Sequence, residues 1–268
     1  MISLSRVTAI ALRQGYLLRG SFSRVLPLFL WVAIDMVLWG FISKYLSSIT
    51  NAGLNFIPTL LGGILLWDFF IRVMQGVTTA FLEDVWSRNF LNVFATPMST
   101  SEYLSGLILT SVTTSIVGLI AMVLLASLAF GLSFFSFGIL LVPFLLSLFL
   151  MGIAMGILAC AMVLRLGPSA EWFVWPIPTV LAPFAGVFYP VSTLPYWMQA
   201  ISKVIPASYV FEGLRDIVAG GRASPLLAVG ALGLGAVYIV GAAWVFRKVY
   251  KNALKTGLIA RYSAESVT

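Results

Sequence analysis

The sequence of 268 residues contains no histidine and only one cysteine, Cys160. Without histidine, the chain can form neither a Ser-His-Asp triad nor a histidine-ligated zinc site, and it has no imidazole to act as a general base. Cys160 alone can form neither an internal disulfide nor a cysteine cluster for zinc or iron–sulfur. The phosphate-binding pattern G-x-x-x-x-G-K-[ST] is also absent. We therefore expect no catalytic residue, no metal site and no cofactor in this chain.

Charged residues are scarce as well. They make up 9% of the sequence, hydrophobic residues make up 60%, and the mean hydropathy is +1.04. Soluble domains carry about 25% charged residues, so this composition indicates a membrane protein. A helix needs about 20 apolar residues to cross a bilayer. Six stretches approach or exceed that length: 25–46, 57–80, 104–130, 137–164, 172–189 and 226–246. We expect an all-α membrane protein with six transmembrane helices in one domain over 1–268.

The basic residues predict the orientation. Four arginines precede residue 25, and five Lys or Arg residues follow residue 246. Cytoplasmic loops are enriched in Lys and Arg, and an even number of spans puts both ends of the chain on one side. We expect a multi-pass protein of the cell (inner) membrane with both termini cytoplasmic. The net charge of +7 then reflects topology and contact with anionic membrane lipids, and we expect no nucleic-acid partner.

Residues 1–24 are amphipathic at helical spacing. Apolar residues share one face: Leu4, Val7, Ala11 and Leu18. Arginines share another: Arg6, Arg13 and Arg24. This pattern predicts a helix in the membrane interface, with its arginines toward the headgroups. The alternative is a basic flank that only fixes the topology.

Residues 81–103 predict a helix on the cytoplasmic side, between the second and third spans. A helix over 81–95 has an apolar stripe and a polar face with Glu83, Asp84, Arg88 and Asn89. Pro97 stops it, and the spacing from Ser99 to Glu102 predicts a capping box that starts the next helix. Such a helix is suited to contact with a partner; the alternative is a surface helix that covers the end of the bundle.

Residues 190–222 contain two apolar stripes, each too short to cross a bilayer. The first includes Trp197 and the second includes Phe211, and Pro195 and Pro206 punctuate the segment. We expect two outer re-entrant helices that enter the outer leaflet and return, forming a gate before the last span.

Three charged residues lie at membrane depth. Asp35 falls in the middle of the first span, and Asp68 and Arg72 are one turn apart in the second. A buried charge costs about 3 kcal/mol on insertion scales, so these groups should pair or face a cavity. Asp68 and Arg72 predict a packing pair, and the alternative is a proton relay or a polar part of the conduit. Asp35 has no such neighbour in its own helix and is the better functional candidate.

Aromatic residues gather in the fifth predicted span, which Pro176, Pro178 and Pro183 interrupt. Irregular backbone at membrane depth must be buried in protein or line a cavity. The candidates for contact with cargo in the path or gate are Trp172, Trp175, Phe184, Phe188, Tyr189 and Trp197. The alternative is the ordinary aromatic belt at the membrane interface.

Several motifs follow one another in a fixed order. Thr96-Pro97 and Glu102 come first, the run 183–190 follows, and then come Leu194-Pro195, Trp197, Pro206, Tyr209 and 212–215. With six spans and the N-terminal amphipathic helix, these motifs resemble ABC-2 type transporter permeases over nearly the whole chain. The resemblance implies two permease subunits, here a second copy of the chain, and two copies of an ABC ATPase subunit that holds ATP and Mg. It also implies that spans one and five of the two copies meet to line the path.

The resemblance further implies which residues touch the ATPase. They lie in the 81–95 helix and the N-terminal helix, and they are Glu83, Asp84, Arg88, Asn89, Arg6 and Arg13. We expect the permease subunit of an ATP-driven exporter whose cargo is amphipathic, either a lipid-linked glycan or a hydrophobic small molecule or drug. The alternative is a secondary active transporter driven by an ion gradient, which would need several buried carboxylates and repeated broken helices. A membrane-embedded enzyme is disfavoured by the absent histidine and scattered acids.

Overall fold

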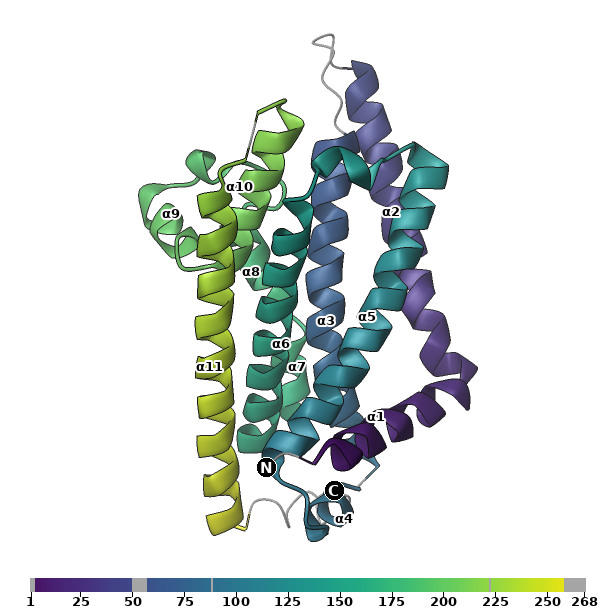
Figure 1. Ribbon diagram of the computed structural model, residues 1–268, viewed down its shortest axis with the longest axis vertical. Helices are drawn as coiled ribbons and strands as arrows, with labels where there is room; N and C mark the ends of the chain where they lie inside the picture. Colours follow the sequence, from purple (N-terminus) through teal and green to yellow (C-terminus); the bar gives the residue numbers. More distant parts are fainter. Residues whose placement is uncertain (1–2, 50–56, 88, 222, 258–268) are drawn as a thin grey trace.

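The computed structural model describes residues 3–49, 57–87, 89–221 and 223–257, and these residues contain helices and no strand. The longest helices are α2 (Phe22–Ile49), α3 (Gly62–Trp86), α5 (Thr100–Phe130), α6 (Leu141–Leu166) and α11 (Pro225–Lys255). The shorter ones are α1 (Leu4–Arg19), α4 (Phe90–Ala95), α7 (Glu171–Val174), α8 (Ile177–Ala185), α9 (Tyr196–Ser202) and α10 (Pro206–Val218). Figure 1 shows α1 lying across one end of the bundle, with α4 beside it, and α9 and α10 at the other. We call these the α1 end and the α10 end.

Five helical stretches of the described chain are long and apolar enough to cross a membrane. They correspond to five of the six predicted spans. The remaining one, expected over 172–189 with its helix interrupted by prolines, is not among these five stretches, because the chain there forms the short helices α7 and α8 with Pro176 between them. Proline has no N–H to donate and clashes with the preceding turn. In series, α7 and α8 carry the chain from the α1 end to the α10 end, so that α11 returns to the α1 end (Figure 1).

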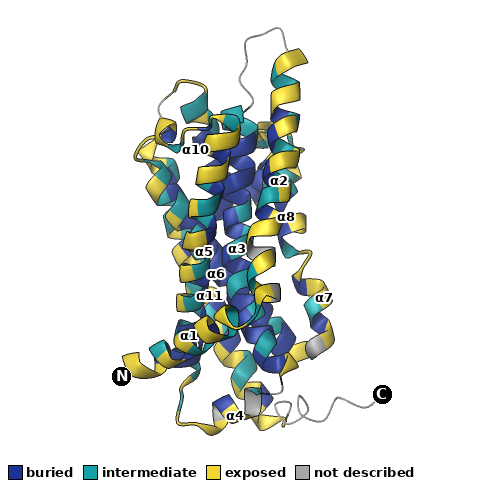
Figure 2. Cartoon of the chain, turned by 90° about the vertical axis from the view of Figure 1, so that its right-hand side faces the viewer, coloured by how far each residue is buried: buried dark blue, intermediate teal, exposed yellow. Residues whose placement is uncertain are grey.

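The core lies around α3 and α6, and Figure 2 shows buried residues along the middle of the bundle. Two glycines of α6 allow its close approach to α3. A Cβ at Gly152 would lie 2.8 Å from Val73 Cβ, and one at Gly156 would lie 2.8 Å from Val77 Cβ. Small residues at this spacing let helix backbones approach in membranes. The glycine repeat of α6 therefore serves packing inside the subunit.

The predicted helix over 81–95 is divided in the structure. Phe81, Leu82 and Val85 are buried in the last turns of α3, which continues to Trp86, and only α4 is a separate helix. The apolar stripe was thus wrongly assigned to a surface helix, because it extends the core-facing side of α3. The predicted end at Ala95 is confirmed, and so is the capping box of α5.

The N-terminal helix is shorter than the predicted 1–24. It ends at Arg19, and Arg24 already belongs to α2. Its buried residues are Val7, Ile10 and Gln14, whereas Leu4 is 76% exposed. The buried side faces α5, where a Cβ at Gly106 would lie 2.6 Å from Ile10 Cβ. Packing against α5 therefore decides which face of α1 is covered.

Candidate functional site

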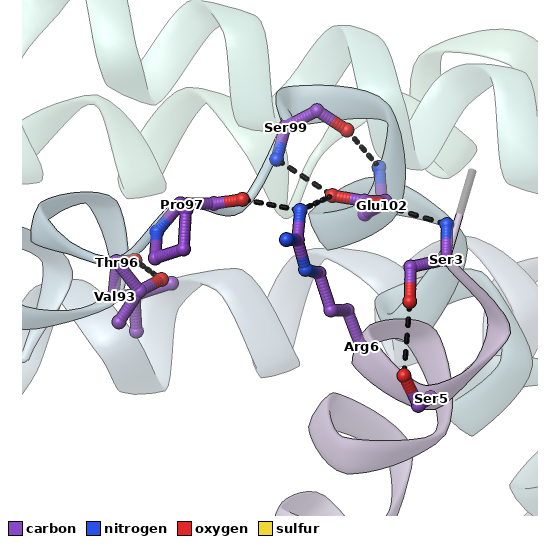
Figure 3. Close-up of polar contacts among 8 residues, drawn as sticks. All are labelled: Ser3, Ser5, Arg6, Val93, Thr96, Pro97, Ser99 and Glu102. Carbon is purple, nitrogen blue, oxygen red and sulfur yellow. Dashed lines mark hydrogen bonds and ion pairs between the residues drawn. The ribbon is translucent and has the colours of Figure 1, made fainter. Parts of the chain in front are cut away.

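The first group of interactions ties the beginning of α1 to the beginning of α5. Glu102, 2% exposed, accepts hydrogen bonds from the backbone N–H groups of Ser3 and Ser99, each at 2.8 Å. Its other close partner is Arg6, whose Nη1 lies 3.3 Å from Oε2. Arg6 also donates to the carbonyl of Pro97, as Figure 3 shows. One carboxylate therefore joins α1, α5 and the segment that follows α4.

A second joint lies deeper, between α1, α3 and α5. Asp84 is 2% exposed and accepts from the Arg13 guanidinium and from the Tyr103 hydroxyl, the latter at 2.7 Å. A buried carboxylate is stable only when hydrogen-bonded or paired with a cation, and both conditions are met here. Asp84 therefore points inward, which corrects its predicted place on an outward polar face.

A third pair joins α2 to α3, with Arg24 Nε 3.2 Å from Glu83 Oε1. Together, three arginines of the N-terminal region pair with three acids of α3 and α5. The helical pattern predicted these arginines at lipid headgroups, and the family resemblance also predicted Arg6 and Arg13 at the ATPase; neither indicated these three acids as their partners. Of the other predicted coupling residues, Arg88 lies outside the described residues, and Asn89 is half-buried and accepts from Asn92 at 3.3 Å. Contact of any of these residues with an ATPase stays a prediction.

The surface at the α1 end is formed by α4 and the segment after it. Asn92, Ala95, Thr96 and Pro97 are exposed. Because Arg6 donates to Pro97, this surface is connected directly to α1. A protein that pressed on α4 would therefore move α1 and α5 with it.

The three charges at membrane depth belong to two helices that contact each other. Asp35 lies in α2, and Asp68 and Arg72 lie in α3. No ion pair between Asp68 and Arg72 within 4 Å occurs among the described residues, so the predicted pair is not closed. The Arg72 side chain instead lies against Gly118 of α5, where an added Cβ would be 2.5 Å from its Cδ. Arg72 therefore packs on α5 and is not paired with Asp68.

The predicted path aromatics form two separate pairs. Phe188 stacks on Trp39 of α2 with ring centroids 5.4 Å apart, and Phe184 meets Trp197 edge-to-face at 6.3 Å. Tyr189 donates to the carbonyl of Pro183 at 3.1 Å. The other two, Trp172 and Trp175, are exposed on and beside α7. Trp39 belongs to this set and was missed; its spacing of one turn from Asp35 could have indicated it.

A polar clamp at the α10 end holds the turn after α8. Arg215 Nη1 donates to the carbonyl of Gly186 at 2.7 Å, and Nη2 lies 2.8 Å from Glu212 Oε1. The same Glu212 oxygen accepts from the N–H of Val191 at 2.7 Å. Gly186 has φ +65°, a left-handed conformation that favours glycine. The pair therefore fixes α10 to the turn between α8 and α9.

Comparison with protein-family models decides what kind of molecule this is. Residues 11–219, most of the chain from the second turn of α1 to the end of α10, match the family described as ABC-2 type transporter. The chain belongs to the ABC-2 type transporter family. It is a permease subunit of an ABC transporter and a multi-pass membrane protein. Such ABC-2 permeases are generally not ATPases themselves and typically work with an ABC ATPase. Among curated proteins, the comparison finds no match.

Proposed function

We propose that this permease exports an amphipathic cargo and that a separate subunit hydrolyses ATP to power the export. Two ATPase subunits, which bind ATP and Mg, would dock at the α1 ends of two copies of the chain, and the α1 end would be cytoplasmic. The cargo would be a lipid-linked glycan or a hydrophobic small molecule. The proposal extends the family assignment to the energy source, the stoichiometry and the direction of transport.

The observation that carries this proposal is the set of three ion pairs at the α1 end. They link α1, α2, α3 and α5 through Arg6–Glu102, Arg13–Asp84 and Arg24–Glu83. Two of the acids are almost fully buried, so these joints resist separation more than surface ion pairs do. An ATPase that displaced α4 would therefore also displace the spans α3 and α5.

The path would run beside α2 and the α7–α8 segment. Large apolar side chains of this region are exposed in the single chain, among them Trp31, Trp172 and Phe188. Exposed apolar surface of this extent in a membrane subunit needs lipid or a second subunit to cover it. A second copy of the chain facing α2 and α8 would enclose the Trp39–Phe188 pair, whose rings could stack on sugar or contact acyl chains.

A second candidate function, ion-gradient-driven transport, is favoured by one observation. Asp35, Asp68 and Arg72 are ionisable residues of α2 and α3, two membrane-capable helices in contact, and ionisable residues at such depth often belong to proton or ion relays. Transport that a proton or sodium gradient drives without ATP would support this candidate over the first.

The docking surface can be tested with one variant at each end of the molecule. Ala95→Arg adds a large side chain to the exposed end of α4, and Ser192→Arg is the control on the exposed turn before α9. We expect Ala95→Arg to lose the copurifying ATPase subunit and its ATP turnover, while Ser192→Arg keeps both. Equal assembly and hydrolysis in the two variants would show that the ATPase does not dock at α4.

A further inference from the structure

A groove runs between α2 and α5, which lie side by side toward the α10 end (Figure 1). Its volume is about 230 Å³. The α2 wall includes Ala33, Val37, Phe41 and Lys44, and the α5 wall includes Ala129 and Phe130. Both helices belong to the stretches that can cross a membrane, so the groove faces the bilayer wherever no second subunit covers it.

The residues of α2 in this groove form one stripe. Ala33, Val37, Phe41 and Lys44 are spaced by four, four and three residues, which puts them on one face over about 16 Å. The first three turns of the stripe are apolar, and the charged residue comes last. Lys44 lies in the last two turns of α2, which ends at Ile49, so a membrane that α2 crosses would have its surface near this residue. The groove is therefore an apolar channel with one cation at its mouth.

Aromatic packing forms the α10 end of the groove. The Phe130 ring packs on the bare backbone of Gly40, where a Cβ would lie 2.1 Å from the ring's Cζ. The same ring meets Phe41 edge-to-face with centroids 5.7 Å apart. The two aromatic rings thus form the wall of the groove beside Lys44.

The charge of Lys44 is not neutralised inside the subunit. Lys44 is exposed, and it forms no ion pair or hydrogen bond with the residues described here. The nearest acid in α2 is Asp35, nine residues earlier, which lies on the opposite side of the helix. An anion that reaches the mouth of the groove therefore meets an uncompensated positive charge.

We propose that this groove binds one anionic phospholipid, with an acyl chain along the apolar stripe and the phosphate at Lys44. Basic pockets between transmembrane helices are suited to anionic headgroups, and the lysine stem can lie along the apolar wall while its amine reaches the interface. The volume is smaller than the about 300 to 1,000 Å³ of pockets for drug-sized ligands, so the groove has room for part of one acyl chain and not for a larger molecule. The site would bind a resident lipid, independently of the cargo and of any ATPase.

The test titrates the purified permease with phosphatidylglycerol and with phosphatidylcholine and counts bound lipids by native mass spectrometry. Lys44→Gln should weaken phosphatidylglycerol binding about fivefold, since one basic side chain near the surface contributes about 1 kcal/mol. It should leave phosphatidylcholine binding unchanged. The matched control is Lys203→Gln, which removes an exposed lysine at the same end of the molecule, outside the groove. Lys203→Gln should keep the wild-type preference.

A second variant tests the groove itself. Ala33→Trp fills the apolar stripe far from Lys44 and should weaken binding of both lipids, with the elution volume in gel filtration confirming an intact fold. Equal losses in Lys44→Gln and Lys203→Gln would show that the lipid responds to general surface charge and would overturn the proposal. Unchanged phosphatidylglycerol binding in a folded Ala33→Trp variant would show that the lipid binds elsewhere.

Discussion

Removal of Asp84 should loosen the N-terminal helix more than any other single change to an acid at the α1 end. Asp84→Ala takes away the acceptor of the Arg13 guanidinium and of the Tyr103 hydroxyl, which is fully buried. Breaking a buried ion pair costs about 3 to 5 kcal/mol. The Arg13 side chain is 28% exposed, so water offsets part of this cost, and we expect about 3 kcal/mol.

The matched control is Glu83→Ala, at the next residue of α3. Its partner Arg24 is 40% exposed, so loss of this pair should cost at most about 1 kcal/mol. A double-mutant cycle of Asp84→Ala with Tyr103→Phe isolates the buried hydrogen bond, for which we expect a coupling energy of about 1 kcal/mol. The measurement is equilibrium unfolding in mixed micelles, followed by tryptophan fluorescence.

Two results would refute this reasoning. If Asp84→Ala and Glu83→Ala destabilised the protein equally, burial of Asp84 would have no energetic consequence. If the cycle with Tyr103→Phe gave no coupling, the hydroxyl and the carboxylate would not interact in the folded protein. In either case the joint would not hold α1 firmly enough to transmit movement to α3.

Two further changes probe the two ends of the molecule. Gly106→Ala places a Cβ 2.6 Å from Ile10 Cβ and should destabilise the protein by about 1 to 3 kcal/mol in the same unfolding assay. The control Gly15→Ala has open space around it and should be neutral or stabilising. A larger loss of stability in Gly15→Ala than in Gly106→Ala would contradict the close packing of α1 on α5. Arg215→Ala removes the clamp on the turn before α9, so a cysteine at Ser192 should react about tenfold faster with a soluble thiol reagent, and an unchanged rate would show that the clamp does not restrain the turn.

The long helices could be predicted from the sequence because length, hydropathy and end signals all agree there. The third span is an example: the Ser99–Glu102 capping box starts α5 and Gly131, with φ +68°, ends it. The prolines of the 172–189 span correctly indicated an interrupted helix, but helical periodicity could not give the boundary between α7 and α8. The family resemblance is confirmed.

The polar joints could not be predicted, because their partners are far apart along the chain. Asp84 has the spacing of a surface residue, and its burial is favourable because of Arg13, 71 residues away, and the Tyr103 hydroxyl. The same holds for Glu102, whose local role as a capping residue was evident while its bond to Ser3 was not. Periodicity reports which face of a helix is apolar and carries no information on distant polar partners. For this reason the arginines of the N-terminal region were assigned to lipid.

We propose that this permease has no ATPase activity of its own and responds to a separate ATPase at its α1 end. The most direct measurement is ATP turnover of the purified chain in nanodiscs, before and after addition of the ABC ATPase subunit that copurifies with it. We predict no turnover by the chain alone, and turnover in the complex that Ala95→Arg abolishes. Substantial hydrolysis by the chain alone, or copurification of no ATPase subunit at all, would contradict the account.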